Sequence, residues 1–219
     1  MEESSGNNIE KEMAIEFIYF DVGGVVILDF SKTDKWERML DELGVRKEDR
    51  DKLGQLFSIE ESKFCLGDKE TDSFISILKN TFKLKLPGDY SLLNDFVNRF
   101  EPNPSLGEII LELKRKYKVG LLTNMYPGML GAIESKGLLP NIEWDVIVDS
   151  SEVGFQKPQP EIFKLASGLA KTSPDKILFV ENSNAHIETA RGLGWKTVLY
   201  NPSNIDSSNA HVLETLRNI

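Results

Sequence analysis

Short apolar runs alternate with amphipathic segments over most of this chain. The amphipathic segments with helical spacing in its second half are 104–117, 127–137, 160–172, 185–194 and 207–219. The apolar runs that we interpret as buried strands are 15–21, 118–123, 144–150, 175–181 and 196–201. Strands that alternate with helices indicate βαβ units. We therefore predict an α/β fold, with a Rossmann-like parallel sheet of about five strands flanked by helices on both faces.

Residues 33–100 show a different pattern. Helical spacing continues throughout this stretch, Gly, Pro and Asp punctuate it, and no strand-like run interrupts it. We interpret it as an inserted all-helical cap, with residues 15–32 and 101–219 forming the α/β core. Residues 1–14 are polar and acidic, which predicts a disordered tail and not a signal peptide.

The composition excludes several classes of function. A formal net charge of −9 disfavours a nucleic-acid partner, because binding to phosphate backbones needs clustered Lys and Arg. A single cysteine, Cys65, excludes an internal disulfide framework and a multi-cysteine zinc site, and it is compatible with a cytoplasmic protein. No apolar run approaches the roughly 20 residues that span a bilayer, so we expect no membrane partner. The oligomeric state stays open.

Polar side chains stand where the predicted strands end. Asp21 ends the first strand, Thr123 and Asn124 end the second, and Glu181 and Asn182 end the fourth. In a parallel sheet, ligands bind beyond the carboxyl ends of the strands, where the strand order reverses. Each of these residues alone is compatible with ordinary turn or cap chemistry. Their common placement at one edge of the sheet predicts a functional site.

The chemistry of these groups is coherent when the lysine of "GFQKPQPEIF", Lys157, is added. A carboxylate such as Asp21 can attack an electrophilic phosphorus. A hydroxyl with the following backbone amide can bind phosphoryl oxygens, and an ammonium can neutralise their charge. A second carboxylate can hold Mg²⁺, which prefers oxygen ligands. The glycines after Asp21 let the backbone turn tightly beside the phosphorus.

Four segments, "FDVGGVVILD", "LLTN", "GFQKPQPEIF" and "ILFVENSNAHIETARGLGW", resemble the four motifs of the haloacid dehalogenase superfamily. The resemblance covers about residues 15–202, and residues 33–100 match the helical cap that follows the first motif. Within the superfamily, the chain is most similar to the small helical-cap (C1) phosphatases that act on sugar phosphates and related metabolites. Their cap closes over the site and selects the substrate.

The resemblance implies a Mg²⁺-dependent phosphoric monoester hydrolase that acts on a small phosphorylated substrate through an aspartyl-phosphate. By position in the motifs, the implied catalytic residues are Asp21 as nucleophile, Thr123 and Lys157. The implied phosphate-binding residues are Thr123, Asn124 and Lys157. The implied metal-binding residues are Asp21, Gly23 through its carbonyl, Glu181 and Asn182.

The chain departs from the usual motifs at two positions. Gly23 stands where the usual phosphatase has a second Asp, the general acid and base, whose help is worth about 10²–10⁴-fold in rate. We therefore predict that Gly23→Asp raises turnover on poor leaving groups. Asn182 replaces the second acidic residue of the fourth motif, so we expect weaker metal binding. His186 stands where these motifs often carry Asn, and we interpret it as a helix-face residue.

Two alternatives follow from these departures. A catalytically degenerate member would bind a phosphorylated ligand or partner without useful turnover. A metal-free carbon–halogen hydrolase also lacks the second Asp, and His186 stands about where such enzymes carry a water-activating Asp. Those enzymes also use an arginine on the cap side, which no residue of 33–100 can be assigned to supply.

Overall fold

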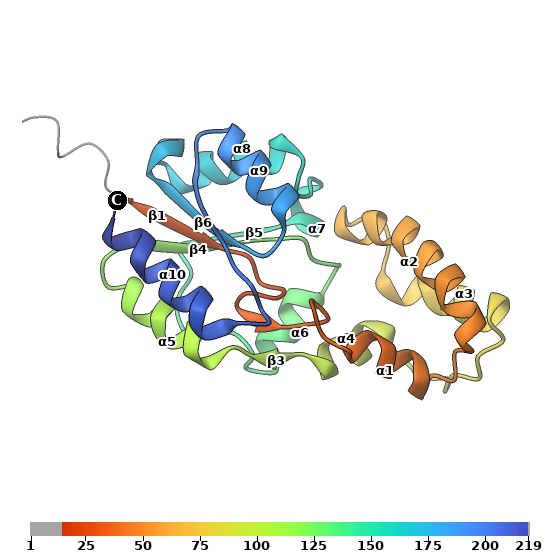
Figure 1. Cartoon of the computed structure of the whole chain (residues 1–219). Coiled ribbons are helices and arrows are strands. Elements are labelled where there is room, and N and C mark those ends of the chain that lie inside the picture. The colour runs from red at the N-terminus through yellow and green to blue at the C-terminus, as the bar shows by residue number, and fades with distance from the viewer. Residues whose placement is uncertain (1–14, 219) are drawn as a thin grey trace, which may run out of the picture.

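The core of the protein is a parallel five-stranded sheet (Figure 1). The computed structural model describes residues 15–218. The strands are β1 (Phe17–Phe20), β4 (Lys118–Thr123), β5 (Val146–Asp149), β6 (Ile177–Glu181) and β7 (Lys196–Leu199). Their order is β5-β4-β1-β6-β7, and every neighbouring pair is parallel. The predicted α/β fold and its five strands are confirmed.

Strand β1 lies at the centre of the sheet, between β4 and β6. From β1 the chain builds one half of the sheet through β4 and β5, then crosses back to build the other half through β6 and β7. The order of the strands therefore reverses at β1. The residues that follow β1, β4 and β6 meet at this reversal, which is the place where α/β sheets bind ligands.

Helices cover both faces of the sheet. In Figure 1, α8 (Pro160–Ala170) and α9 (Asn184–Gly192) lie on one face. On the other face lie α5 (Pro104–Leu113), α6 (Met129–Ser135) and α10 (Ile205–Arg217). A short helix α7 (Ser150–Val153) follows β5, and a 3-10 turn η3 (Pro174–Lys176) precedes β6. Both faces are buried, which explains why the strands read as continuous apolar runs.

The side chains of β1 alternate between the two faces. Phe17 and Tyr19 join the buried cluster under α8 and α9, where the Tyr19 ring stacks on Trp195 at 5.6 Å between centroids. Ile18 and Phe20 join the larger cluster on the opposite face. This alternation is the two-residue period of a strand. It anchors β1 on both sides and so positions the residue that follows it.

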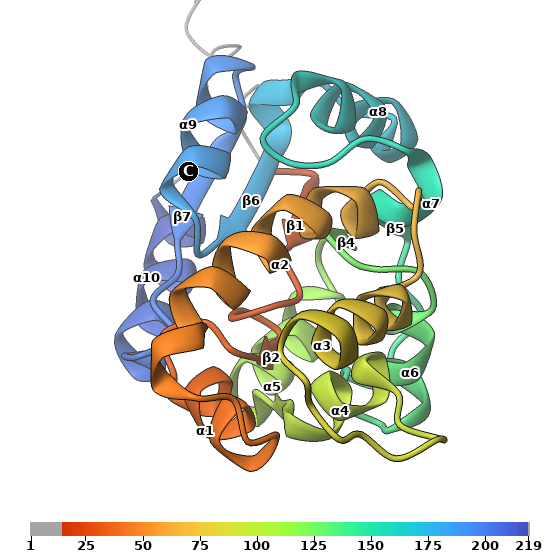
Figure 2. The same ribbon diagram turned by 90° about the vertical axis from the view of Figure 1, so that its right-hand side faces the viewer.

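A helical segment lies beyond the carboxyl ends of the strands. It contains α1 (Lys35–Glu42), η1 (Lys47–Asp49), α2 (Arg50–Cys65), η2 (Thr71–Phe74), α3 (Ile75–Thr81) and α4 (Leu92–Arg99). Residues 33–100 contain no strand, and Figure 2 shows their helices in front of the sheet. A short antiparallel ribbon of β2 (Ile27–Leu28) and β3 (Glu101–Pro102) joins the two ends of this segment to the core. The cap boundaries at 33 and 100 stay a prediction.

The structure adds details that the sequence patterns do not contain. The ribbon β2–β3 has two residues in each strand, which is too short for a visible period. The disordered tail predicted for residues 1–14 lies outside the described residues. Among residues 15–218, no helix is long and apolar enough to cross a membrane.

Candidate active site

A cavity of about 700 Å³ lies between the carboxyl edge of the sheet and the helical segment. Five of the predicted site residues line it: Asp21, Gly23, Asn124, Lys157 and Asn182. The helical segment supplies Trp36, Phe57, Glu61 and other side chains to the opposite wall. The structure therefore brings these five residues together at one cavity, while the other two predicted residues, Thr123 and Glu181, are buried and do not line it.

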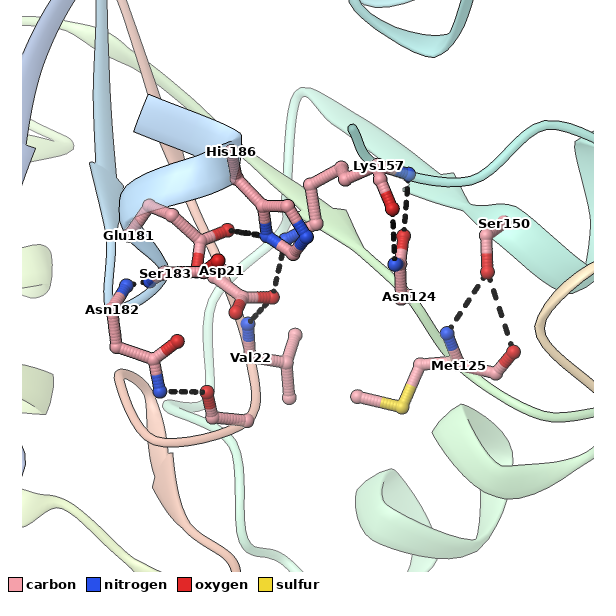
Figure 3. A network of polar contacts seen from close by, with 11 residues as sticks. Asp21, Val22, Asn124, Met125, Ser150, Lys157, Glu181, Asn182, Ser183 and His186 are labelled. Atoms are coloured by element: carbon pink, nitrogen blue, oxygen red, sulfur yellow. Dashed lines mark hydrogen bonds and ion pairs between the residues drawn. The ribbon is translucent and has the colours of Figure 1, made fainter. Parts of the chain in front are cut away.

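Lys157 is buried between two carboxylates (Figure 3). Its Nζ atom lies 2.8 Å from Oδ1 of Asp21 and 2.6 Å from Oε2 of Glu181. The side chains of Lys157, Asp21 and Glu181 are 1%, 10% and 0% exposed. The same Oδ1 accepts a hydrogen bond from the Val22 amide at 2.8 Å. These contacts fix the orientation of the Asp21 carboxylate, and they compensate two charges that would otherwise be costly to bury.

The two carboxylates are in different electrostatic environments. Burial and the charge of Glu181 raise the pKa of Asp21 to about 7, and the ammonium of Lys157 opposes this rise. Burial acts in the same direction on Glu181, but Lys157 and His186 outweigh it and lower the pKa of Glu181 to about 2. Glu181 is therefore the permanent negative charge of the pair. The charge on Asp21 depends on the cations beside it.

Glu181 already has a partner in each of its four lone-pair directions. Oε1 accepts hydrogen bonds from the amides of Asn182 at 2.8 Å and Ser183 at 2.9 Å. Oε2 lies 2.6 Å from Nζ of Lys157 and 3.0 Å from Nδ1 of His186. Glu181 thus orients the groups around it, and direct contact with a metal ion would displace one of them. The sequence favours a helix-face role for His186, but this residue lines the cavity and contacts Glu181.

The side chain of Asn124 is committed to the backbone of Lys157. Its Nδ2 donates to the Lys157 carbonyl at 2.9 Å, and its Oδ1 accepts from the Lys157 amide at 2.8 Å. These two bonds tie the end of β4 to the loop that enters α8. Asn124 therefore positions Lys157, which leaves its own backbone amide as the group that could face a phosphoryl oxygen.

Thr123 carries a hydroxyl without a partner. The residue is 1% exposed, and its Oγ1 has no hydrogen-bond partner among the residues that the structure describes. A buried hydroxyl in this state costs free energy, about 1–3 kcal/mol, unless something else satisfies it. Its place at the end of β4 suits an acceptor atom of a bound ligand.

The candidate oxygen donors for a metal ion come from Asp21, Gly23 and Asn182. Nδ2 of Asn182 donates to the carbonyl of Gly23 at 3.0 Å, and a half-turn of the amide would present Oδ1 at the same place. Residues 15–218 contain no group of three or more His, Cys, Asp and Glu side chains that could hold a metal. Asp21, the Gly23 carbonyl and Asn182 are an oxygen-only set that fits Mg²⁺, with water completing the coordination. Because the set has few charges, we expect any metal site that it forms to be weak.

Asp29 is a site residue that the sequence analysis does not single out. It lines the same cavity, just after β2. Its Oδ1 accepts a hydrogen bond from the Ser31 amide at 2.8 Å. Burial raises the pKa of Asp29 above its ordinary value. A carboxylate close to an apolar run is the signal that could have identified it.

The helical segment contacts the α/β core around the cavity. Oη of Tyr126 donates to Oε1 of Glu61 in α2 at 2.8 Å, and Nε2 of Gln156 donates to Oγ of Ser62 at 2.7 Å. Several aromatic rings of the cavity wall pack against one another: Phe30, Trp36, Phe57, Phe96 and Tyr126. The wall opposite Asp21 is therefore largely apolar and held in place from both sides.

Comparison with protein families gives one match. The model of the haloacid dehalogenase-like hydrolases matches residues 15–194. This range contains β1 to α9, every residue that lines the cavity, and Thr123 and Glu181.

Individual relatives support the match. The chain is 25% identical over 205 residues to bifunctional epoxide hydrolase 2 of Sus scrofa, and the aligned region covers 85% of this chain and 36% of that protein. It is 30% identical over 102 residues to D-ribitol-5-phosphate phosphatase of Bacteroides thetaiotaomicron, and the aligned region covers 44% of this chain and 48% of that protein. The chain thus spans between a third and a half of the length of these relatives.

A solved structure shares the fold. It is a wild-type HAD family enzyme of Bacteroides thetaiotaomicron in complex with magnesium and inorganic phosphate. The TM-score is 0.70 at 21% identity, over 86% of this chain and 96% of that chain.

Proposed function

The chain belongs to the haloacid dehalogenase-like hydrolases, and we propose that it is a Mg²⁺-dependent phosphatase of a small phosphorylated metabolite. In this proposal, Asp21 is the nucleophile and forms an aspartyl-phosphate. Thr123, Asn124 and Lys157 bind the phosphoryl group. Asp21, the Gly23 carbonyl and Asn182 hold the metal, while Glu181 orients Lys157, His186 and the amide of Asn182 through its hydrogen bonds.

The observation that carries the proposal is the arrangement around Lys157. Its ammonium contacts Asp21 at 2.8 Å, and the hydroxyl of Thr123, at the end of the neighbouring strand β4, has no partner among the described residues. A phosphoryl group placed beside Asp21 would supply the acceptor that Thr123 lacks and a negative charge for Lys157. Such a ligand satisfies both groups at once, which an uncharged ligand would not do.

The reaction would have two steps. The free oxygen of Asp21 attacks the phosphorus, the bond between phosphorus and the ester oxygen breaks, and that oxygen takes a proton from a neighbouring acid as the alcohol leaves. Water then attacks the phosphorus of the aspartyl-phosphate and releases inorganic phosphate. Lys157 and Thr123 contact the phosphoryl oxygens throughout and stabilise the charge that develops there. Mg²⁺, held by Asp21, the Gly23 carbonyl and Asn182, would supply further positive charge beside the phosphoryl group.

The cavity wall restricts what the alcohol can be. The cap and the loop after β4 present mainly aromatic and apolar side chains, and the polar exceptions are Ser58, Glu61, Ser62 and Asn124. A substrate that fills this volume would place an apolar or mixed group against the wall and its phosphate against Lys157. This favours a small metabolite over a phosphorylated macromolecule. The cytoplasmic location expected from the sequence stays a prediction.

Phosphate release from a panel of phosphomonoesters tests the proposal. The panel runs from aryl and anomeric phosphates to alkyl phosphates, with Mg²⁺ or with chelator. Asp21→Asn is the matched control, because it keeps the shape of the side chain and removes the nucleophile. We expect Mg²⁺-dependent release by the wild-type protein and none by Asp21→Asn. Equal release by a folded Asp21→Asn protein would contradict the covalent mechanism.

The alternative function is binding without turnover. Gly23 and Asn182 favour it, because they remove two carboxylates that phosphatases with these motifs usually use. A protein of this kind would be stabilised against heat by inorganic phosphate, yet would release no phosphate from any ester of the panel. The two readings therefore give opposite results in one experiment.

A further inference from the structure

The space beside Gly23 is occupied by the carboxylate of Asp29. A Cβ atom added to Gly23 would lie 2.5 Å from Oδ2 of Asp29 and 3.3 Å from its Cγ. These are the nearest heavy atoms that such a Cβ would meet. The side-chain position that is empty at Gly23 is thus filled by a carboxylate from another part of the chain.

The loop after β1 explains how Asp29 reaches this place. The amide of Gly24 donates to the Ile27 carbonyl at 2.9 Å, and the amide of Ile27 donates to the Val22 carbonyl at 3.0 Å. Gly24 has a φ of +72°, which the turn requires and which suits glycine. The chain therefore folds back on itself immediately after the nucleophile. Asp29 follows the returning strand β2 and comes to lie beside Gly23.

Asp29 is held so that one oxygen is fixed and the other points to Gly23. Oδ1 accepts the hydrogen bond of the Ser31 amide at 2.8 Å, while Oδ2 is the atom nearest to the added Cβ. Asp29 and Asp21 line the same cavity. The leaving group of a phosphate ester bound at Asp21 would extend into this shared cavity, which Asp29 lines.

We propose that Asp29 is the general acid and base of this enzyme, taking the role for which residue 23 has no side chain. The inference rests on the phosphatase function proposed above. In the first step, the bond between phosphorus and the ester oxygen breaks, and the carboxylic acid of Asp29 gives its proton to that oxygen. In the second step, water attacks the phosphorus of the aspartyl-phosphate. Asp29 takes a proton from this water, so Asp21 and Asp29 both return to their starting states.

This placement changes what Gly23→Asp should do. On the sequence alone, the substitution supplies a missing acid. In the structure, it would put a second carboxylate into the space of Asp29. The gain predicted from the sequence therefore requires that Asp29 be shortened as well, as in the double variant Gly23→Asp with Asp29→Gly.

The test compares two leaving groups. Kinetics are measured with 4-nitrophenyl phosphate, whose leaving group needs little protonation, and with propyl phosphate, whose leaving group needs it strongly. Asp29→Asn keeps the acceptor for the Ser31 amide and loses the acid. We expect kcat/KM for propyl phosphate to fall by about 10²–10⁴-fold and that for 4-nitrophenyl phosphate to fall by less than about tenfold. The double variant should recover turnover of propyl phosphate.

Asp149→Asn is the matched control. Asp149 is a buried carboxylate at the end of β5 that accepts a hydrogen bond from the Ser151 amide at 2.9 Å, as Asp29 does from Ser31. It should leave the ratio of the two rates unchanged. Equal losses on both esters in Asp29→Asn would overturn the inference and indicate a structural role. If Asp29→Asn does not fold, the double variant of Gly23→Asp with Asp29→Gly is the deciding protein. If that protein hydrolyses 4-nitrophenyl phosphate but not propyl phosphate, the inference is overturned.

Failure of the underlying function has a different signature. If the folded wild-type protein releases no phosphate from either ester, the phosphatase proposal fails, and the role of Asp29 fails with it. If the wild-type protein hydrolyses both esters, the function stands, and only the response of Asp29→Asn decides its role.

Discussion

The Nζ atom of Lys157 lies 2.8 Å from Oδ1 of Asp21, and both side chains are buried. The same ammonium contacts Glu181 at 2.6 Å and lies 5.3 Å from the centre of the Phe179 ring. One cation thus serves two carboxylates that come from the ends of neighbouring strands. This arrangement couples the stability of the core to the chemistry of the cavity, because neither carboxylate can stay charged cheaply without Lys157.

Replacing Lys157 with Met should destabilise the protein by about 3–5 kcal/mol at neutral pH, since it leaves two buried carboxylates without their cation. Without Lys157, each carboxylate raises the pKa of the other above its value in the unfolded chain. The cost is therefore largest at pH 7 and shrinks towards pH 5 as one group takes up a proton. Urea unfolding at both pH values measures this, with Asp21→Asn as a control that keeps the pair of Lys157 and Glu181. An equal loss at both pH values would contradict the explanation.

Replacing Thr123 with Val should separate binding from folding. Val keeps the shape of the side chain and removes a buried hydroxyl that has no partner among the described residues, so stability should stay the same or rise. Inhibition by inorganic phosphate should weaken by about 10–100-fold, which corresponds to a lost hydrogen bond to a charged group. Thermal unfolding and a phosphate inhibition constant measure the two effects. Thr123→Ser keeps the hydroxyl and should bind phosphate as the wild type does; a clear loss of stability in Thr123→Val would show that the hydroxyl has a structural partner.

Replacing Asn182 with Asp should make stability depend on Mg²⁺. Nδ2 of Asn182 donates to the Gly23 carbonyl, and a carboxylate oxygen there would face that carbonyl without a proton between them. We expect a lower Tm than wild type in chelator and a larger rise of Tm when Mg²⁺ is added, because a carboxylate adds charge to the metal site. An equal ionic strength of KCl controls for screening. Identical Mg²⁺ responses in the two proteins would place the metal away from Asn182.

The core of the fold and the first members of the site could be predicted from the sequence because their cause is local. An apolar run such as 17–20 specifies a buried strand, and parallel topology sends the carboxyl ends of all strands to one edge. Asp21 directly follows β1, and Thr123 and Glu181 are the last residues of β4 and β6, so the strand order places all three at one edge of the sheet. Lys157 belongs to a loop, and the motif "GFQKPQPEIF" predicts it as a site residue.

The roles of other residues could not be predicted because they depend on the path of the loops. Asn124 resembles a phosphate ligand in sequence, but its side chain holds the backbone of Lys157. His186 has the spacing of a helix-face residue, yet it reaches Glu181 because α9 begins at the edge of the cavity. Neither contact leaves a trace in hydrophobic periodicity, which reports burial and not direction.

The sequence by itself determined the parallel sheet, the helical insertion and the carboxylate that ends β1, because each follows from which residues are apolar and in what order. Only the tertiary structure decided what compensates the glycine at position 23. The loop of Val22 to Ile27 folds back through its own backbone hydrogen bonds, and this brings Oδ2 of Asp29 to the place where a side chain of residue 23 would stand. The side chain of Asp29 thus occupies the place of a side chain at position 23, although the two residues are separate along the chain. This replacement of one residue by another follows from the folded path of the loop and not from the order of the residues.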